Sequence, residues 1–203
     1  VQEVIAASRY LKHRAPDLDA AIELGGEDAK LLYLSNGVEL RMNEACAGGT
    51  GAFIDQMASL LDVDAAGLNK LASEAEISHP MASRCGVFAK TDLVALLNGG
   101  VPKSEVARSV LDAVAEQTVS GLACGRPVRG KIAFLGGPLT FLSELRAAFE
   151  RRLSSTGTTF ASFCDAHCAV AIGAAMEGMD PASRAHRSRV WHSIDDLVRE
   201  ILS

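Results

Sequence analysis

The feature that most constrains the fold is a set of three short apolar strands separated by two tight turns near the start of the chain. Strands are predicted over residues 20–24, 30–34 and 38–42, and the third alternates apolar and polar residues. Gly25-Gly26 follows the first strand, and Asn36-Gly37, a strong hairpin signal, follows the second. The sequence therefore predicts three consecutive antiparallel strands.

Beyond residue 43 the apolar residues recur at helical spacing. Helices are predicted from Phe53 onward and over 68–75, 87–97 and 104–124, and the last of these is stopped by Gly125 and Pro127. A strand at 131–135, a helix at about 141–153, a strand at 158–163 and a helix at 166–179 follow, and Ser193 caps a final helix. Strands, then helices, then strand–helix units predict a mixed α/β domain.

Composition narrows the class of protein. The chain has 203 residues, of which 48% are hydrophobic, and a net charge of −5, which argues against nucleic acid or an anionic membrane as a partner. No apolar run approaches the ~20 residues of a membrane span, and no signal peptide is recognised. Five cysteines, an odd number, argue against a secreted disulfide framework and favour a reducing cytoplasm. Because the chain opens on Val1 inside an apparent helix or strand, we expect it to be part of a longer polypeptide.

Two glycine turns that directly follow strands are candidate nucleotide contacts. In Glu23–Lys30 the glycines allow close backbone approach, Glu27 and Asp28 could hold a metal ion or a water, and Lys30 could neutralise phosphate. The alternative is a plain glycine hairpin with solvated charges. The second turn, Gly136-Gly137, joins a strand to a helix, which is by itself a weak nucleoside signal. No P-loop motif occurs in the sequence.

Two cysteines share one local environment. Cys46 precedes a glycine-rich loop that leads directly into a helix, and Cys85, 39 residues later, precedes another helix. A helix N-terminus lowers the pKa of a thiol, which suits a reactive thiolate and equally a thiolate bound to an iron–sulfur cluster. The alternative is two small buried cysteines. Since two thiolates do not complete a four-cysteine site, the other two could come from a symmetry mate.

The remaining cysteines and histidines carry weaker signals. Cys164 and Cys168 frame a CDAHC segment that lacks the further ligands of a zinc site, and we expect Cys168 and Cys124 to be packing residues. The histidines at 13, 79, 186 and 192 share no ligand spacing, and we expect them at the surface.

Taken in order, GGEDAK, MNEACAGGTGAF, SRCGVFAKTD and FLGGP resemble the activator family of 2-hydroxyacyl-CoA dehydratases, which includes the ATPase subunits of benzoyl-CoA reductase. The resemblance covers roughly residues 1–179. It implies the actin/Hsp70/sugar-kinase ATPase fold, Mg²⁺ with ATP or ADP, and one [4Fe–4S] cluster shared across a homodimer or a pseudo-dimer with a second copy. Cys46 and Cys85 match the two cluster ligands of each subunit.

The resemblance also assigns the glycine segments. Glu23, Glu27 and Asp28 would be catalytic, although the family's segment reads closer to D-I-G-G-Q-D, so both glutamates are departures. An extra carboxylate near a γ-phosphate would repel it unless a magnesium ion intervenes. The positions assigned to cofactor binding are Gly25, Gly26, Lys30, Gly48, Gly49, Thr50, Gly51, Gly136 and Gly137.

By the same resemblance, ATP hydrolysis changes the angle between the cluster-bearing helices. The cluster then passes one low-potential electron from a ferredoxin- or flavodoxin-type donor to a dehydratase. Residues 1–15 would end a first lobe, 16–163 form the second lobe, 164–179 return to the first, and 180–203 form a linker and terminal helix. Alone, such a piece is not expected to hold ATP properly. Two other readings stay open: a kinase of the same fold, and a non-enzymatic module that dimerises or holds a cluster.

Overall fold

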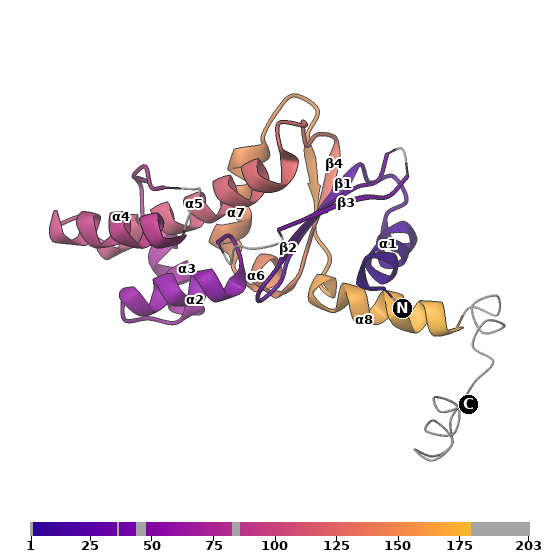
Figure 1. The fold of residues 1–203 in the computed structure, drawn as a ribbon, viewed down its shortest axis with the longest axis horizontal. Coiled ribbons are helices and arrows are strands. Elements are labelled where there is room, and N and C mark those ends of the chain that lie inside the picture. Colours follow the sequence, from indigo (N-terminus) through magenta and orange to yellow (C-terminus); the bar gives the residue numbers. More distant parts are fainter. Residues whose placement is uncertain (1, 36, 44–47, 83–85, 180–203) are drawn as a thin grey trace, which may run out of the picture.

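A five-stranded mixed sheet forms the centre of the molecule (Figure 1). The structure is a computed structural model that describes residues 2–35, 37–43, 48–82 and 86–179. The strand order is β3-β2-β1-β4-β5. The bounds are β1 (Ala20–Leu24), β2 (Ala29–Tyr33), β3 (Glu39–Met42), β4 (Lys131–Leu135) and β5 (Thr159–Ala161).

The three predicted antiparallel strands are confirmed. β1 pairs antiparallel with β2, so that Glu23 lies opposite Lys30, and β2 pairs antiparallel with β3. β4 joins the other side of β1 in parallel and carries β5, also in parallel. Parallel pairing requires crossover connections, which the helices of the chain provide.

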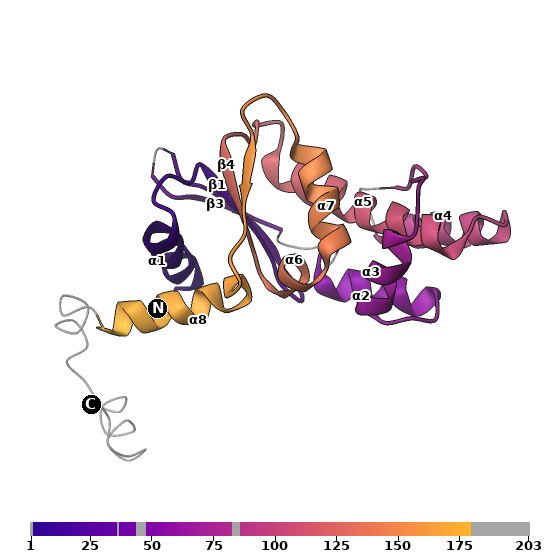
Figure 2. The same ribbon diagram turned by 180° about the vertical axis from the view of Figure 1, so that it is seen from behind.

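Helices cover both faces of this sheet (Figures 1 and 2). On one face lie α1 (Glu3–Arg14) and α8 (Ala169–Met179), which is preceded by the short 3₁₀ turn η1 (Ala166–Cys168). On the other lie α5 (Lys103–Ala123) and α7 (Ser143–Leu153). Alternate residues of β1 serve the two faces: Ile22 joins the core cluster under α5 and α7, and Ala21 joins the cluster under α1. All five residues of β1 are buried, as expected for a strand covered on both faces.

The other helices lie beyond one end of the sheet (Figure 1). They are α2 (Gly51–Leu60), α3 (Ala65–Ser73) and α4 (Gly86–Asn98), and the short α6 (Gly137–Phe141) follows β4. α4 extends away from the sheet, and its Val87 and Phe88 are 70% and 64% exposed. Within the described residues, no helix combines the length and the apolar character that crossing a membrane requires.

The helix predicted over about 141–153 is confirmed as α7, and a separate short helix, α6, precedes it. α6 ends at Phe141, and Leu142 adopts an extended conformation before α7 begins at Ser143. The side-chain oxygen of Asn69 in α3 accepts a hydrogen bond from the Glu144 N–H at 2.8 Å, and so satisfies the new helix start. Because this cap comes from a residue 75 positions away, the local pattern of apolar residues could not predict it. The helix predicted over 166–179 likewise begins with η1, and the strand at 158–163 shortens to β5.

Two predicted packing cysteines are exposed. Cys124 terminates α5 in the left-handed region, with φ 46°, and its Sγ–H donates to the Gly121 carbonyl at 3.1 Å. Cys168 is exposed at the end of η1. The expectation that Cys124 and Cys168 are packing residues was therefore wrong, because in each case the thiol lies where a helix starts or stops.

The histidines agree with the prediction in part. His13 is exposed as expected, whereas His79 is half-buried against Glu105. His186 and His192, like the helix predicted after Ser193, lie outside the described residues.

Candidate functional site

The turn between β1 and β2, called here the glycine turn (residues 25–28), is closed by its own backbone. The Gly25 N–H donates to the Asp28 carbonyl at 2.8 Å. A Cβ at Gly25 would lie 2.3 Å from Asp28 Oδ1, so a side chain would displace that carboxylate. The first glycine motif of the sequence is thus a tight turn that presents backbone and a carboxylate at the end of β1.

The second glycine motif is hydrogen-bonded to the first. The Gly51 N–H donates to the Gly25 carbonyl at 2.9 Å, and the Ala52 N–H donates to the Gly26 carbonyl at 2.7 Å. A Cβ at Gly51 would lie 3.1 Å from the Gly25 carbonyl oxygen, which requires a small residue there. The N-terminus of α2 therefore rests directly on the glycine turn.

The residues before Gly51 are fixed by α5 rather than by this turn. Thr50 is fully buried, Gly49 has φ 82°, and its carbonyl accepts a hydrogen bond from Thr118 Oγ1 at 3.2 Å. A Cβ at Gly48 would collide with the Gln117 side chain at 2.0 Å. Of the cofactor-binding positions expected in this segment, Gly51 faces the glycine turn, Gly48 and Gly49 pack on α5, and Thr50 is buried.

The third glycine motif reaches the same edge of the sheet from β4. Gly136 has φ 90°, and a Cβ there would lie 2.0 Å from the Leu24 carbonyl oxygen of β1. Its N–H donates to the Ala166 carbonyl at 3.2 Å. The ends of β1 and β4 therefore approach so closely that only glycine fits between them.

A pocket of about 280 Å³ lies where the three motifs meet. Gly26, Gly51 and Gly137 each contribute to its wall, together with apolar side chains that include Ile54 and Phe141 and the carboxylate of Asp55. Apolar walls suit a planar ring, and a carboxylate accepts hydrogen bonds from hydroxyl groups. This composition is suited to a nucleoside.

Asp55 and Phe141 were not predicted as site residues. Phe141 is 67% exposed, and its ring lies against that of His167 with centroids 5.0 Å apart. The available sequence signal was an aromatic residue four positions after Gly137, and an acidic residue four positions after Gly51. Neither spacing distinguishes a pocket wall from an ordinary helix face until the two helices are placed.

Beside the glycine turn, Lys30 is surrounded by carboxylates. Its Nζ lies 2.7 Å from Asp28 Oδ2, 2.9 Å from Glu3 Oε1 and 3.8 Å from Glu23 Oε2, and the residue is only 2% exposed. Burial opposes the charged form of Lys30, but hydrogen bonds to Asp28 and Glu3 and the charge of Glu23 outweigh it, so its pKa is raised. Lys30 was predicted to neutralise phosphate, and in the structure three carboxylates share its ammonium group.

Among the three carboxylates, Glu23 is the buried one, and its environment disfavours the charged form. It is 8% exposed, and its Oε2 has no hydrogen-bond partner among the described residues. Burial raises its pKa, Lys30 opposes that shift, and Glu3 and Asp28 add to it. Three carboxylates facing one ammonium group leave an excess of negative charge, which a divalent cation would neutralise. Glu27 is exposed on the turn.

The two predicted cluster ligands, Cys46 and Cys85, lie outside the described residues. The helices that follow them are in contact: a Cβ at Gly86, the first residue of α4, would lie 3.1 Å from the Phe53 ring of α2. The two helix starts that follow the cysteine motifs are therefore neighbours. Within the described ranges, no group of three or more His, Cys, Asp or Glu side chains is arranged to hold a metal ion.

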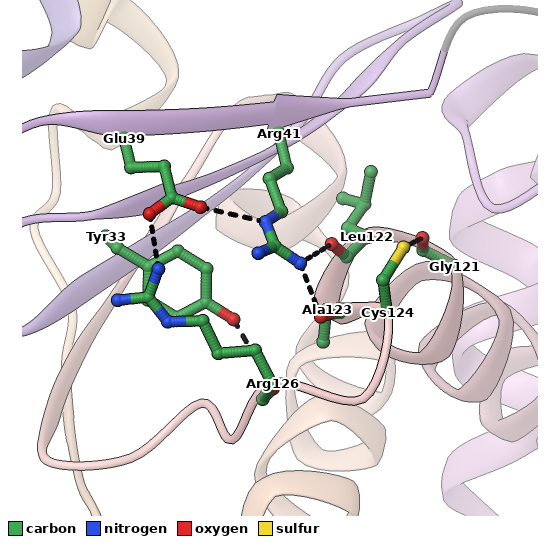
Figure 3. A network of polar contacts seen from close by, with 8 residues as sticks. All are labelled: Tyr33, Glu39, Arg41, Gly121, Leu122, Ala123, Cys124 and Arg126. Atoms are coloured by element: carbon green, nitrogen blue, oxygen red, sulfur yellow. Dashed lines mark hydrogen bonds and ion pairs between the residues drawn. The ribbon is translucent and has the colours of Figure 1, made fainter.

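A polar network ties the far end of α5 to the sheet (Figure 3). Arg41 of β3 donates to the Ala123 carbonyl at 2.6 Å, which satisfies the end of the helix. Glu39 binds both Arg41 and Arg126, and the Arg126 guanidinium stacks over the Tyr33 ring at 3.8 Å. α5 is thus anchored at the β3 edge and supports the residue 48–50 loop nearer its middle.

Comparison with known proteins gives a consistent picture. The (R)-2-hydroxyglutaryl-CoA dehydratase activating ATPase of Acidaminococcus fermentans is 31% identical over 124 residues, 60% of this chain and 47% of that protein. The crystal structure of component A of that dehydratase matches 87% of this chain and 67% of its own, with a TM-score of 0.78 and 28% identity. The activator of the 2-hydroxyisocaproyl-CoA dehydratase from Clostridium difficile, with bound ADPNP, matches 95% of this chain and 71% of its own, with a TM-score of 0.80 and 26% identity.

These matches confirm the actin-like ATPase fold predicted from the sequence. The chain spans about half the length of the first of these relatives. A family model matches residues 6–178, nearly all of the described part of the chain. This chain belongs to the BadF/BadG/BcrA/BcrD ATPase family.

Proposed function

We propose that this chain is the second lobe of an ATP-dependent activator that passes a low-potential electron to a 2-hydroxyacyl-CoA dehydratase. The observation that carries the proposal is the meeting of three glycine motifs at one pocket, beside the buried Lys30 and the three carboxylates that face it. The structural relative from Clostridium difficile is a dehydratase activator with ADPNP bound. This chain spans 47% of the Acidaminococcus fermentans relative, which is consistent with one lobe of a two-lobe ATPase.

The nucleotide would lie across the glycine turn. Ile54 and Phe141 would contact the base, Asp55 would accept hydrogen bonds from the ribose, and the backbone of Gly25, Gly26 and Gly137 would approach the phosphates. The buried Glu23 Oε2, which accepts no hydrogen bond from the described residues, and the neighbouring Asp28 would suit a Mg²⁺ ion, which prefers carboxylate oxygens and would neutralise phosphate charge. Glu27, where the family has glutamine, adds negative charge at the turn and makes this metal ion more necessary.

The cluster would be held by Cys46 and Cys85 and completed by the same two cysteines of a second copy. Two observations support this arrangement: the helices that follow both cysteines in the sequence are in contact, and the first turn of α4 exposes the apolar Val87 and Phe88. When bound, a [4Fe–4S] cluster supplies one-electron chemistry at low potential. Helix N-termini next to thiolate ligands stabilise their negative charge and tune that potential.

The hydrogen bonds between α2 and the glycine turn give nucleotide state a path to the cluster ligands. Gly51 and Ala52 hold the start of α2 on Gly25 and Gly26, so a movement of the turn moves the helix that follows Cys46. For nucleotide to change the electron transfer, it must bind the two helix arrangements with different affinity. A dehydratase would be the electron acceptor and a ferredoxin- or flavodoxin-type protein the donor.

Anaerobic reconstitution of a polypeptide extended upstream tests the proposal. We expect a brown dimer with about one four-iron cluster, lost in Cys46→Ser and Cys85→Ser and retained in the matched control Cys124→Ser, whose thiol is exposed at the end of α5. Mg²⁺-dependent ATP hydrolysis should fall in Glu23→Gln and Asp28→Asn. A colourless monomer that hydrolyses ATP only in the presence of a small-molecule phosphate acceptor would contradict the activator function and favour a kinase of the same fold.

A further inference from the structure

α1 and α8 are locked together as one unit. The Tyr10 hydroxyl donates to Asp165 Oδ1 at 2.5 Å, and Arg14 pairs with the same carboxylate, which immediately precedes η1. A Cβ at Gly173 of α8 would lie 1.8 Å from the Ala6 carbonyl oxygen of α1, so the two backbones are in direct contact. Ion pairs and close packing therefore fix α1 to the segment that contains η1 and α8.

The other end of α1 contacts β2, next to the glycine turn. Glu3 lies in the first turn of α1, and its Oε1 is 2.9 Å from Lys30 Nζ of β2. The Glu3 side chain is 49% exposed, whereas Lys30 is buried. Lys30 also contacts Asp28 of the glycine turn and Glu23 of β1. One buried ammonium group thus joins the glycine turn to the α1–α8 unit.

We propose that Glu3 is a positioning residue which, through Lys30, transmits occupancy of the glycine turn to the α1–α8 unit. This inference rests on the proposed nucleotide site. When Mg²⁺ and nucleotide phosphates occupy the turn, the metal ion takes up the charge of Glu23 and Asp28, and Lys30 then depends on Glu3 for its counter-charge. The Glu3–Lys30 pair tightens, and the first turn of α1 is held more firmly against β2.

The reverse of this coupling follows from linkage. Without Glu3, Lys30 has only Glu23 and Asp28 as partners and competes with Mg²⁺ for them. The presence of Glu3 therefore favours metal binding at a distance, although its own carboxylate is not a ligand in this scheme. Binding of Mg²⁺ and the conformation of α1 must influence each other by the same factor.

The test uses the upstream-extended polypeptide with a non-hydrolysable ATP analogue. In Glu3→Gln, the Mg²⁺ concentration for half-maximal analogue binding should rise about two- to fivefold, the range expected of a partly exposed ion pair. Analogue binding without Mg²⁺ should not change. Hydrogen exchange of residues 3–8 should slow on adding Mg²⁺ and analogue to the wild-type protein but not to Glu3→Gln. Glu3→Asp should restore part of both effects, and Lys12→Gln, an exposed change on the same helix, should behave as wild type.

The outcomes separate this inference from the proposed function. If the wild-type protein binds Mg²⁺ and the analogue while Glu3→Gln shows the same Mg²⁺ dependence and exchange, the link is refuted and the nucleotide site stands. If Glu3→Gln weakens analogue binding equally with and without Mg²⁺, Glu3 is only structural and the link is again refuted. If the wild-type protein binds no nucleotide, both ideas fail.

Discussion

Gly136→Ala gives the sharpest test of the close approach between β1 and β4. The new Cβ would start 2.0 Å from the Leu24 carbonyl oxygen, whereas ordinary contact begins at 3.4 Å, so the strand ends must separate by about 1.4 Å. Forcing a non-glycine residue to φ 90° and ψ 162° costs about 1–3 kcal/mol, and overpacking adds about 1–3 kcal/mol. We expect a loss of about 4 kcal/mol.

For a protein of this size that loss corresponds to a melting temperature about 8–16 °C lower, measured by circular dichroism. Gly121→Ala is the matched control, because Gly121 lies inside α5 with nothing within 4 Å of the new Cβ. There the same substitution should raise stability by about 0.5–1 kcal/mol through better helix propensity. A Gly136→Ala protein that melts within about 2 °C of wild type would show that β1 and β4 do not need this contact.

Three further outcomes are expected. Phe149→Ala removes a fully buried ring that packs edge-on against Phe134, and should cost about 3–5 kcal/mol in urea unfolding, whereas a loss under about 1 kcal/mol would contradict the core described here. Asp64→Ala removes the cap that accepts the Gly67 N–H at 2.7 Å and should cost about 1 kcal/mol, which Asp64→Asn should largely restore. Because the folded-state pKa of Glu23 is raised, its contribution to stability is full below the ordinary glutamate pKa and is lost as pH rises through the folded value; Glu23→Gln should therefore gain stability relative to wild type as pH rises, and parallel pH profiles for the two proteins would refute the shift.

Local sequence signals predicted where most helices and strands lie, but not the interactions that end them. β1 matches its predicted bounds, because an apolar run ending in Gly25-Gly26 leaves little choice. The break at Leu142 could not be predicted, since it depends on a hydrogen bond that the Glu144 N–H donates to Asn69 Oδ1 only after α3 and α7 are packed. Cys124 was misplaced for a related reason: apolar residues precede it, but the helix ends there in a left-handed turn that directs the thiol outward.

The candidate site divides in the same way. Each glycine motif could be recognised from its place after a strand or before a helix, and the structure brings Gly26, Gly51 and Gly137 to one pocket. Asp55 and Phe141 could not be assigned, because a pocket wall on a helix has the same spacing as any other helix face. The role of Glu3 beside Lys30 depends on the crossing of α1 over β2, which no local pattern contains.

The contact between Gly173 and Ala6 also limits how the protein can move. Sliding α8 along α1 by about one turn would bring the side chain of Ala169 or Glu177, four residues away on the same helix face, onto a carbonyl group that leaves no space for it. This contact opposes shear between the two helices, and we expect them to move together as a lever. Its hinges would be the two short connections to the sheet, residues 15–19 and 162–165. A rotation of this lever would displace the end of α8 at Met179 furthest, because that end lies farthest along the helix from the connection at residues 162–165.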